Sequence, residues 1–594
     1  MIASTRAGIL RTMSLRLLGR YLTRHRVRYA AGVLLLLATN ACALLIPWVI
    51  KDVIDALGGA DGTHATRATV ALGALTVVGL ALVQGLSRTA SRLVLLGAGQ
   101  RVEAEVRHDL FEALLRLEPA FYQSRRTGDL MSRATNDLQS VSMLLGFGLL
   151  SLVNTAIVYA GTLIVMLRID LWLTVAALAP YPFLVAVARR YTARAHAEAL
   201  AVQEQLARLA DKTQENLSGM AVVRAYTLAP REIEAFGSLN REHLARVLRQ
   251  TRTHGLFSPL LAIMSGVGAL CVLWVGGGAV LEGRLTLGVL VAFTGYVAYL
   301  AWPTMALGWV LAIVRRGMAA LDRVNEILDT RPQIADGPGA GALPPHGRGA
   351  IELRHLTFRY STNRPPALRD VSVRIEAGSS VAIVGPTGAG KTSLAMLLPR
   401  LWDPPPGTLL IDGVEIHAIA LRDLRAAIAL VPQEAFLFSR PLRENVAFGA
   451  PEAGVAGAAE VAGLAPDVDR LAAGWDTLIG ERGLTLSGGQ RQRATLARAL
   501  LRDPRILVLD DAFAAVDAET EAAILERLLE RIRQRTTLVI THRLRVAAML
   551  DRILVMDDGR IVEDGTHAQL IARGGLYARL WRRQQLESTI EAAG

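Results

Sequence analysis

The stretch SVAIVGPTGAGKT (residues 380–392) decides the fold of the C-terminal part of this chain. An apolar strand, Ser380–Val384, leads into a glycine-rich loop that ends at Lys391 and Thr392, and a helical segment follows. Glycines let backbone N–H groups approach phosphates, and the helix N-terminus adds partial positive charge. This G-x-x-x-x-G-K-[ST] pattern predicts an α/β P-loop ATPase domain, with Lys391 at the β- and γ-phosphates and the Thr392 hydroxyl on Mg²⁺.

Two later strands end in polar side chains of the kind that such a site uses. Ile506–Asp510 is apolar and ends in a carboxylate that can hold Mg²⁺ through water, and Asp511 stands where a general base for the attacking water belongs. Leu538–His542 is a second apolar strand, ending in a titratable histidine. A histidine after a strand is often structural. Because ligands bind at the carboxyl ends of the strands in open α/β sheets, we expect these side chains to converge on one phosphate.

Upstream of this domain, six stretches contain no Asp, Glu, Lys or Arg. They are residues 29–50, 68–87, 138–167, 171–188, 253–281 and 285–314. Each is long enough to cross a hydrocarbon core of roughly 30 Å. We therefore expect an α-helical polytopic membrane domain over residues 1–330, a linker rich in Pro and Gly over 331–349, and the ATPase domain over 350–594.

The connections after the second and fourth stretches are long and rich in helix-forming residues. Arg101–Leu117 places apolar side chains on one stripe, and Ala195–Gln250 has a similar composition. We expect the spanning helices to continue as long cytoplasmic extensions, with turns around Glu118–Asp129 and Ser218–Pro230 that contact the ATPase domain.

The net charge of +12 lies entirely in the first part of the chain. Residues 1–350 carry 35 basic and 23 acidic side chains, whereas residues 351–594 carry 30 of each. The excess clusters beside the apolar stretches, and seven arginines with no acidic residue precede the first of them. By the positive-inside rule, the sequence predicts a multi-pass protein of the cytoplasmic (inner) membrane with both termini in the cytoplasm. The bilayer, and no nucleic acid, is the partner that this charge indicates. Two cysteines exclude a disulfide scaffold.

The stretch Leu486-Ser-Gly-Gly-Gln490 looks like the ABC-transporter signature, and the whole chain resembles an ABC exporter half-transporter, with six spans and one ATPase domain. The resemblance implies ATP and Mg²⁺ as cofactors. It also implies that ATP is sandwiched between the phosphate loop of one subunit and the signature of another, formed by Leu486, Ser487, Gly488, Gly489 and Gln490.

Further family landmarks follow in order along the chain. The resemblance implies that Tyr360 stacks on adenine, that Gln433 senses Mg²⁺ and the attacking water, and that His542 grips the γ-phosphate. It places Asp517 in a loop that crosses between ATPase domains and Gly480-Glu-Arg-Gly483 in a loop that contacts the membrane domain. Taken singly, Tyr360 also fits an ordinary strand aromatic, Gln433 a surface turn residue and Asp517 a helix N-cap.

The predicted site thus has three sets of residues. The nucleotide-binding set is Tyr360, Gly385, Pro386, Thr387, Gly388, Ala389, Gly390, Lys391, Thr392 and Ser393. The catalytic set is Asp511, His542 and Gln433, and the Mg²⁺ set is Thr392, Gln433 and Asp510.

The segment Phe121 through Gly128–Leu130, with Arg133 and Asp137, resembles the first intracellular loop of these exporters. Arg133 and Asp137 are four residues apart, so an ion pair between them on a helix surface is the simpler alternative.

Asp511 departs from the family, which usually has Glu at this position. Aspartate is one methylene shorter, which withdraws the carboxylate by roughly 1.5 Å, and a misplacement of about 1 Å can cost on the order of 10²-fold in rate. A homodimer would then have two slow sites. We therefore favour a heterodimer, in which a second half-transporter carries Glu and this chain supplies the weaker ATP site. A homodimer is the alternative.

The sequence says less about the transported substrate than about the ATP site. The six stretches hold no charged side chain, and Trp274, Trp302 and Trp309 lie in the last two of them. This predicts an apolar or amphipathic substrate (a drug, lipid or peptide), although packing against lipid explains the aromatic residues equally well. Polar Asn40, Gln84 and Asn154 fit either cargo contact or bridges between helices. Export is the expected activity, and a homodimeric lipid or drug flippase and an ATP-gated channel of the same architecture are the alternatives.

Overall fold

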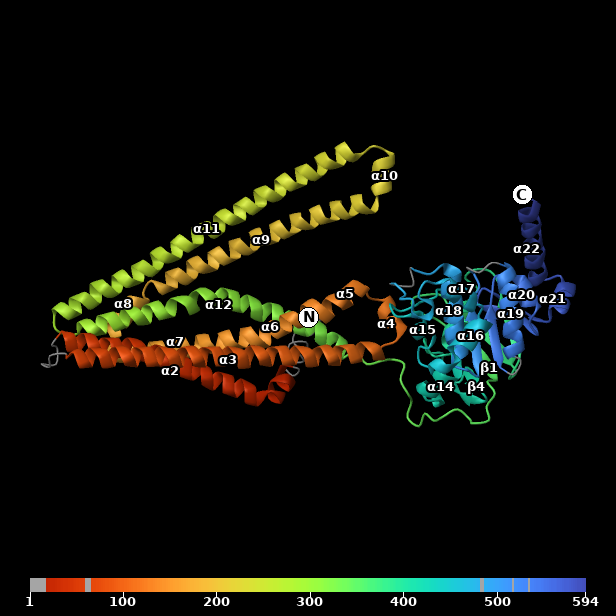
Figure 1. Ribbon diagram of the computed structural model, residues 1–594, viewed down its shortest axis with the longest axis horizontal. Coiled ribbons are helices and arrows are strands. Elements are labelled where there is room, and N and C mark those ends of the chain that lie inside the picture. Colours follow the sequence, from red (N-terminus) through yellow and green to blue (C-terminus); the bar gives the residue numbers. More distant parts are fainter. Residues whose placement is uncertain (1–17, 59–65, 481–484, 515–517, 533–534, 594) are drawn as a thin grey trace. The chain divides into compact units, whose positions relative to one another are not determined.

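The computed structural model describes residues 18–58, 66–480, 485–514, 518–532 and 535–593. The chain divides into two compact units (Figure 1). The first comprises Met1–Leu115 and Thr127–Thr330, and the second comprises Arg116–Arg126 together with Arg331–Gly594.

The first unit is entirely helical in its described part. Its elements are α2 (Arg26–Leu57), α3 (Arg67–Arg116), α5 (Thr127–Ser132), η1 (Arg133–Asp137), α6 (Leu138–Met143), η2 (Leu144–Gly148), α7 (Leu149–Ile169), α8 (Leu171–Leu178), α9 (Tyr181–Ser218), α10 (Met220–Ala225), α11 (Ala229–Leu281) and α12 (Leu287–Leu328). The segments η1 and η2 are π-helical turns in the continuous helix Thr127–Ile169.

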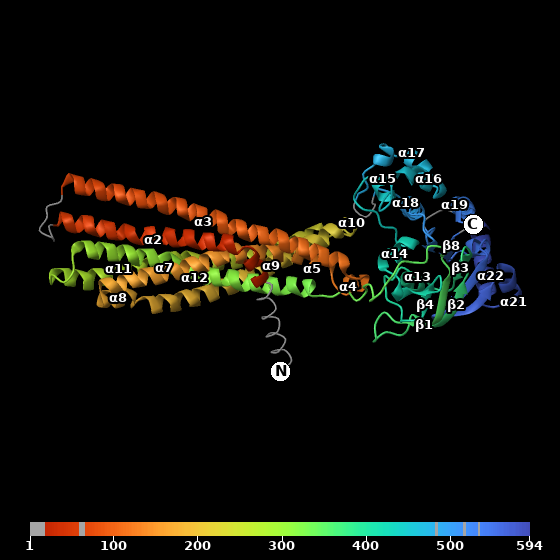
Figure 2. The same cartoon turned by 90° about the horizontal axis from the view of Figure 1, so that it is seen from below.

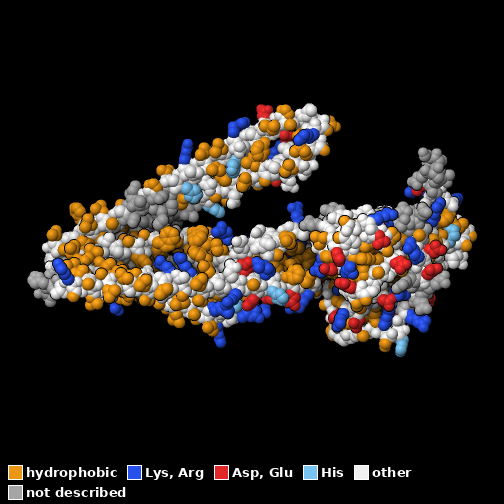
Figure 3. All heavy atoms as spheres, viewed as in Figure 1, with side chains coloured by type: hydrophobic (Ala, Val, Ile, Leu, Met, Phe, Trp, Pro, Cys, Tyr) orange, Lys and Arg blue, Asp and Glu red, His pale blue; other side chains and the backbone are white. Residues whose placement is uncertain are grey.

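Within the described residues, four helices are long and apolar enough to cross a membrane. They are Arg26–Leu57, Arg67–Arg116, Thr127–Ile169 and Leu287–Leu328. Two shorter apolar helices, Leu171–Phe183 and Gly266–Leu281, lie where the sequence predicts the fourth and fifth spans. Hydrophobic side chains cover much of this unit's surface (Figure 3), and Leu72, Leu75 and Trp172 are among the exposed ones. Apolar surface on this scale suits contact with lipid.

Helices of the first unit continue far beyond the apolar stretches. Helices α9 and α11 run side by side and are joined by α10 (Figure 1). Lys212 Nζ lies 2.6 Å from Glu232 Oε2, and Gln205 Nε2 donates to the Leu239 carbonyl at 3.1 Å, so polar contacts hold the two extensions together.

Helix α3 meets η2 at close range. A Cβ atom added to Gly99 would lie 2.8 Å from the Cα atom of Gly146, closer than side-chain atoms ever come. Two glycines facing each other let the two backbones touch at this crossing. Because the helices cross here, the part of α3 that precedes Gly99 faces α7.

The second unit is built on two sheets. The six-stranded sheet has the order β10-β9-β3-β8-β7-β6, in which β9, β3, β8, β7 and β6 are mutually parallel and β10 is an antiparallel edge. These strands are β3 (Ser380–Val384), β6 (Ile428–Val431), β7 (Ile506–Asp510), β8 (Thr536–Ile540), β9 (Arg552–Asp557) and β10 (Arg560–Gly565). The four-stranded antiparallel sheet has the order β2-β1-β4-β5, with β1 (Ile351–Phe358), β2 (Leu368–Ile375), β4 (Leu409–Ile411) and β5 (Val414–Glu415).

Side chains of the parallel strands alternate between two cores. Ala382 and Val384 of β3 pack into a core with the helices, whereas Val381 and Ile383 pack into a core with the antiparallel sheet. A parallel strand that is buried on both faces reads as a continuous apolar run, as these strands do. The helices are α4 (Pro119–Gln123), α13 (Lys391–Leu397), α14 (Leu421–Ala427), α15 (Leu442–Val446), α16 (Val455–Val461), α17 (Ala465–Arg470), α18 (Gly488–Leu501), α19 (Ala518–Ile532), α20 (Leu544–Ala548), α21 (His567–Arg573) and α22 (Leu576–Ala593).

Helix α4 belongs to the second unit although it lies between helices of the first in the sequence. Its Phe121 is buried, and the Arg125 guanidinium lies 4.1 Å from the Phe121 ring centroid. Glu118 Oε2 accepts a hydrogen bond from the Gln333 N–H at 3.2 Å. The segment that the sequence associates with an intracellular loop is therefore grouped with the sheet-containing unit.

Candidate active site

The loop after β3 needs glycine for steric reasons. Gly385 and Gly390 have φ angles of 151° and 95°. A Cβ atom on Gly385 would lie 2.1 Å from the Met556 carbonyl oxygen, and one on Gly390 would lie 2.5 Å from that of Ala367. The backbone conformation and the close neighbours therefore both exclude larger residues.

Lys391 is buried inside this loop. Its Nζ donates to the carbonyl oxygens of Gly385 and Pro386, each at 2.9 Å. Burial lowers the pKa of Lys391, and the nearby Asp510 and Asp511 carboxylates oppose that effect. The ammonium group is thus held against the curve of the loop, where a phosphate would meet it.

Asp510 lies at the end of β7, beside the start of α13. Thr392 Oγ1 donates to Asp510 Oδ1 at 3.3 Å. The carboxyl is 1% exposed, and among the described residues its second oxygen, Oδ2, has no hydrogen-bond partner. Burial is the main cause that raises the pKa of Asp510, and the hydrogen bond from Thr392 opposes it. A buried oxygen without a partner, next to a hydroxyl, fits the all-oxygen coordination that Mg²⁺ prefers.

The parallel register brings the other predicted residues to the same edge of the sheet. The Asp511 N–H donates to the Ile540 carbonyl at 2.9 Å, and the Thr541 N–H donates to the Ile383 carbonyl at 3.3 Å. The charges of Asp511, Lys391 and His542 all act on the pKa of Asp510, so these four groups share one electrostatic site. The structure thus assembles the loop, Asp510, Asp511 and His542 from three neighbouring strands.

Gln433 lies at this same edge but farther from the loop. It follows β6, which is separated from β3 by β7 and β8, and its side chain is exposed.

Helix α22 is hydrogen-bonded to the segment that contains His542. Gln584 Nε2 donates to the His542 carbonyl at 3.3 Å, and Gln584 Oε1 accepts from the Leu544 N–H at 2.7 Å. The His542 side chain itself is exposed. Sequence reasoning missed Gln584, because no motif marks a C-terminal helix that contacts the backbone of a distant strand end.

Tyr360 lies beside α13. Its hydroxyl donates to Ser393 Oγ at 2.9 Å, and its ring packs edge-on against Trp402 and Phe358, with centroid distances of 4.7 and 5.0 Å. Since β1 ends at Phe358, Tyr360 is beyond the strand rather than within it. Trp402 is a second aromatic residue of this cluster that the sequence did not single out.

The signature residues form the start of α18. Ser487 caps the helix: its Oγ accepts from the Gln490 N–H at 3.3 Å, and Gln490 Oε1 accepts from the Ser487 N–H at 2.9 Å. Gln490 Nε2 also donates to Asp467 of α17 at 3.2 Å. In Figure 2, α18 lies with α15, α16 and α17, whereas α13 lies near β1 and β4. The signature and the phosphate loop therefore lie in different parts of the second unit.

Some predicted residues cannot be placed. Asp517 and the three residues that follow Gly480 in the loop Gly480–Gly483 lie outside the described residues.

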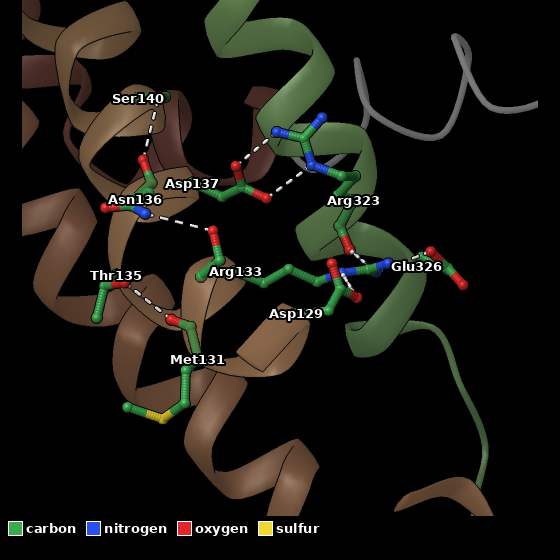
Figure 4. A network of polar contacts seen from close by, with 10 residues as sticks. Asp129, Met131, Arg133, Thr135, Asn136, Asp137, Ser140, Arg323 and Glu326 are labelled. Carbon is green, nitrogen blue, oxygen red and sulfur yellow. Dashed lines mark hydrogen bonds and ion pairs between the residues drawn. The ribbon is translucent and has the colours of Figure 1, made fainter. Parts of the chain in front are cut away.

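In the first unit, Arg133 and Asp137 bind α12 rather than each other (Figure 4). Arg133 donates to Asp129 Oδ2 at 3.0 Å and to Glu326 Oε2 at 2.8 Å. Arg323 donates to the two oxygens of Asp137 at 2.8 and 2.5 Å. The alternative of an ion pair between Arg133 and Asp137 is wrong. The π-helical turn between them has wider spacing than an α-helix, and both side chains reach the neighbouring helix.

A phosphate-loop ATPase domain joined to a helical membrane domain is the class that this fold and site define. The family model for the ABC transporter transmembrane region matches residues 29–304, and the ABC transporter model matches residues 368–514.

Similar proteins and a similar solved structure agree with this class. The chain is 35% identical to the probable multidrug resistance ABC transporter ATP-binding/permease protein YheI of Bacillus subtilis, over 96% of this chain and 98% of that protein. It is 32% identical to an ATP-dependent lipid A-core flippase of Syntrophus aciditrophicus, over 95% and 94% of the two chains. A bacterial Atm1-family ABC exporter solved with ATP bound has a similar structure, with a TM-score of 0.75 and 31% identity over 94% of this chain and 99% of that one.

The chain belongs to the ABC transporter family and has the organisation of an ABC exporter half-transporter, as the sequence predicted. The match to the ATPase model lies within the second unit, and most of the match to the transmembrane-region model lies within the first.

Proposed function

We propose that this chain exports an apolar or amphipathic substrate by alternating access, as one half of a dimer with a second half-transporter, and supplies the weaker of the two ATP sites. It acts in the cytoplasmic membrane with both termini in the cytoplasm. ATP and Mg²⁺ are its cofactors.

The proposal of a weaker ATP site depends on the residue that follows Asp510. Asp511 is fixed at the end of β7 by the hydrogen bond from its N–H to Ile540, with a φ of 48°. A backbone held in this way cannot move to compensate for a short side chain. The carboxylate that should activate water therefore stops roughly 1.5 Å short of the reach of the Glu that is usual in the family.

The parts around Asp511 support nucleotide binding even where hydrolysis is slow. Lys391 holds its charge at the loop, and Thr392 and Asp510 present oxygens for Mg²⁺. The ion supplies charge neutralisation between the β- and γ-phosphates when it is bound. Gln433 and His542 orient the attacking water and the γ-phosphate in this proposal.

An intact signature supports the role in a heterodimer. The start of α18 is capped by reciprocal hydrogen bonds between Ser487 and Gln490, and Gln490 also donates to Asp467. This chain can thus complete the ATP site of a partner while its own site stays slow. Relatives described as a multidrug transporter and a lipid flippase support an apolar or amphipathic cargo.

The test is to tag this chain in its own host, purify it from membranes, and identify the copurifying protein and the ATPase rate. We expect a second half-transporter with Glu after its own strand-terminal Asp. The pair should hydrolyse ATP much faster than this chain alone. Fast hydrolysis by the isolated chain, with no partner recovered, would instead establish a homodimer.

A further inference from the structure

A cavity of about 300 Å³ lies in the first unit between α3, the η2–α7 helix and α12. Its lining includes Arg92 of α3, Phe147, Ser151 and Asn154 of η2–α7, and Trp302 and Trp309 of α12. A cavity of this size holds a small molecule or the head of a larger one. Asn154, Trp302 and Trp309 lie within apolar stretches, so the cavity is at the depth of the predicted spans.

Arg92 brings a positive charge to this wall. It lies five positions after the charge-free stretch 68–87, and α3 continues through it without a break. In the part of the chain that the structure describes, neither Arg92 nor Arg88, one turn earlier, has a carboxylate within ion-pair distance. Arg92 is exposed in the single chain and lines the cavity, so its guanidinium is accessible to a ligand there and would attract an anionic group.

A hydrogen-bond relay fixes the orientation of the Asn154 amide in the wall of the cavity. Asn40 Nδ2 donates both to the Leu36 carbonyl, at 2.7 Å, and to Asn154 Oδ1, at 3.0 Å. The Tyr299 hydroxyl donates to Asn40 Oδ1 at 2.7 Å.

A backbone carbonyl can only accept, so the orientation of the Asn40 amide is unambiguous, and that of Asn154 follows from it. The oxygen of Asn154 is used within the protein, and its NH₂ group is left to donate. Asn154 and Arg92 therefore both offer hydrogen-bond donors to the cavity.

Three aromatic residues, Phe147, Trp302 and Trp309, also line the cavity. Phe147 and Trp309 pack with their ring centroids 4.9 Å apart, and Trp302 is 73% exposed in the single chain. Apolar rings next to donor groups suit a ligand with an acceptor-rich head and an apolar body.

We propose that this cavity binds the anionic head of an amphiphile, a phosphate or carboxylate, through Arg92 and the Asn154 amide, with the apolar part against Trp302 and Trp309. This inference rests on the proposed export function and narrows its substrate class. A cationic amphiphile would meet Arg92 as a like charge and would be repelled from the cavity.

The test uses the full-length chain in phosphatidylcholine nanodiscs and saturation binding of radiolabelled dodecyl phosphate and dodecyltrimethylammonium, corrected with empty nanodiscs. We expect clear preference for the phosphate. Arg92→Gln should weaken its binding roughly tenfold, the scale of one charged hydrogen bond, and Arg92→Lys should keep most of it. Asn154→Asp should weaken the binding of dodecyl phosphate and strengthen the binding of dodecyltrimethylammonium. Arg101→Gln, an exposed arginine farther along α3, is the matched control and should change neither.

Folding of each variant is checked by gel filtration and thermal unfolding. Equal binding of both probes, or Arg92→Gln behaving like Arg101→Gln, would overturn the inference. Competition by phosphatidylglycerol supports a lipid head as the occupant, whereas equal competition by inorganic phosphate contradicts an amphiphile. ATP-dependent transport of a neutral dye is measured separately, in the dimer that is recovered from membranes. Transport without anion preference refutes only this inference, and anion binding without any transport refutes the proposed function.

Discussion

Arg323 of α12 holds the carboxylate of Asp137 with two hydrogen bonds, one from Nε at 2.8 Å and one from Nη2 at 2.5 Å. The Asp137 side chain is 10% exposed and that of Arg323 48%. The hydrogen bond to Asp137 is the main cause that raises the pKa of Arg323. This contact ties the helix that follows α4 to α12, the helix that leads into the ATPase domain.

Breaking this contact should destabilise the first unit. A double-mutant cycle of Asp137→Asn and Arg323→Gln should give a coupling energy of about 1 kcal/mol, reduced by solvent at the exposed Arg323. Thermal unfolding in detergent measures it. The pair Arg208–Glu204, whose side chains are 51% and 61% exposed, is the control and should show almost none. Equal coupling in both pairs would remove any special role for Asp137.

Lengthening Asp511 should restore hydrolysis at the weak site. In a dimer whose partner site is disabled at its catalytic Glu, Asp511→Glu should raise the remaining ATPase rate by on the order of 10-fold to 10²-fold, because the carboxylate regains its reach. Asp511→Asn should leave the rate near that of the unchanged residue. The rate is measured by phosphate release at saturating ATP. If Asp511→Glu brings no gain, side-chain length is not the cause of the weak site.

Removing the charge of Asp510 should stabilise the nucleotide-free protein. Burial raises the pKa of Asp510, so the folded state binds this proton more tightly than the unfolded chain does. Its ionised form therefore lowers stability above the folded pKa, and this loss disappears as the pH falls toward about 4.

At neutral pH, Asp510→Asn should thus gain about 1–3 kcal/mol, the scale of an unpaired buried group, and the gain should shrink in acid. The variant should also lose the stabilisation that Mg²⁺ and ATP give the unchanged chain. Thermal unfolding between about pH 7 and pH 4, with and without Mg²⁺ and ATP, tests both statements. Destabilisation of the nucleotide-free variant at neutral pH would contradict them.

Most of the site could be predicted from the sequence because its motifs have fixed spacing. The loop at Gly385–Thr392 and the strand ends at Asp510 and His542 were predictable because each chemical role needs one residue type next to one apolar strand. Arg92 was not, because counting charges within apolar stretches stops at residue 87, whereas α3 runs on to Arg116. The pairing of Asp137 was missed for a different reason. Sequence spacing assumes an α-helix, and the π-helical turn at η1 turns the side chains toward α12.

Gln584 should act on hydrolysis by positioning His542, without touching the nucleotide. Its amide bonds both the His542 carbonyl and the Leu544 N–H, so both hydrogen bonds stabilise the backbone conformation of residues 542–544. Gln584→Ala should lower kcat by roughly tenfold, the scale of a small misplacement, with the KM for ATP changed less than about twofold. Gln584→Glu keeps an acceptor for the Leu544 N–H but loses the donor to the His542 carbonyl. Its kcat should therefore lie between that of the unchanged chain and that of Gln584→Ala. Arg583→Ala, an exposed neighbour on α22 that pairs with Glu587, is the control. Measured in the dimer with the partner site disabled, a rise in KM with kcat unchanged would show that α22 serves nucleotide binding instead, and that His542 does not depend on Gln584.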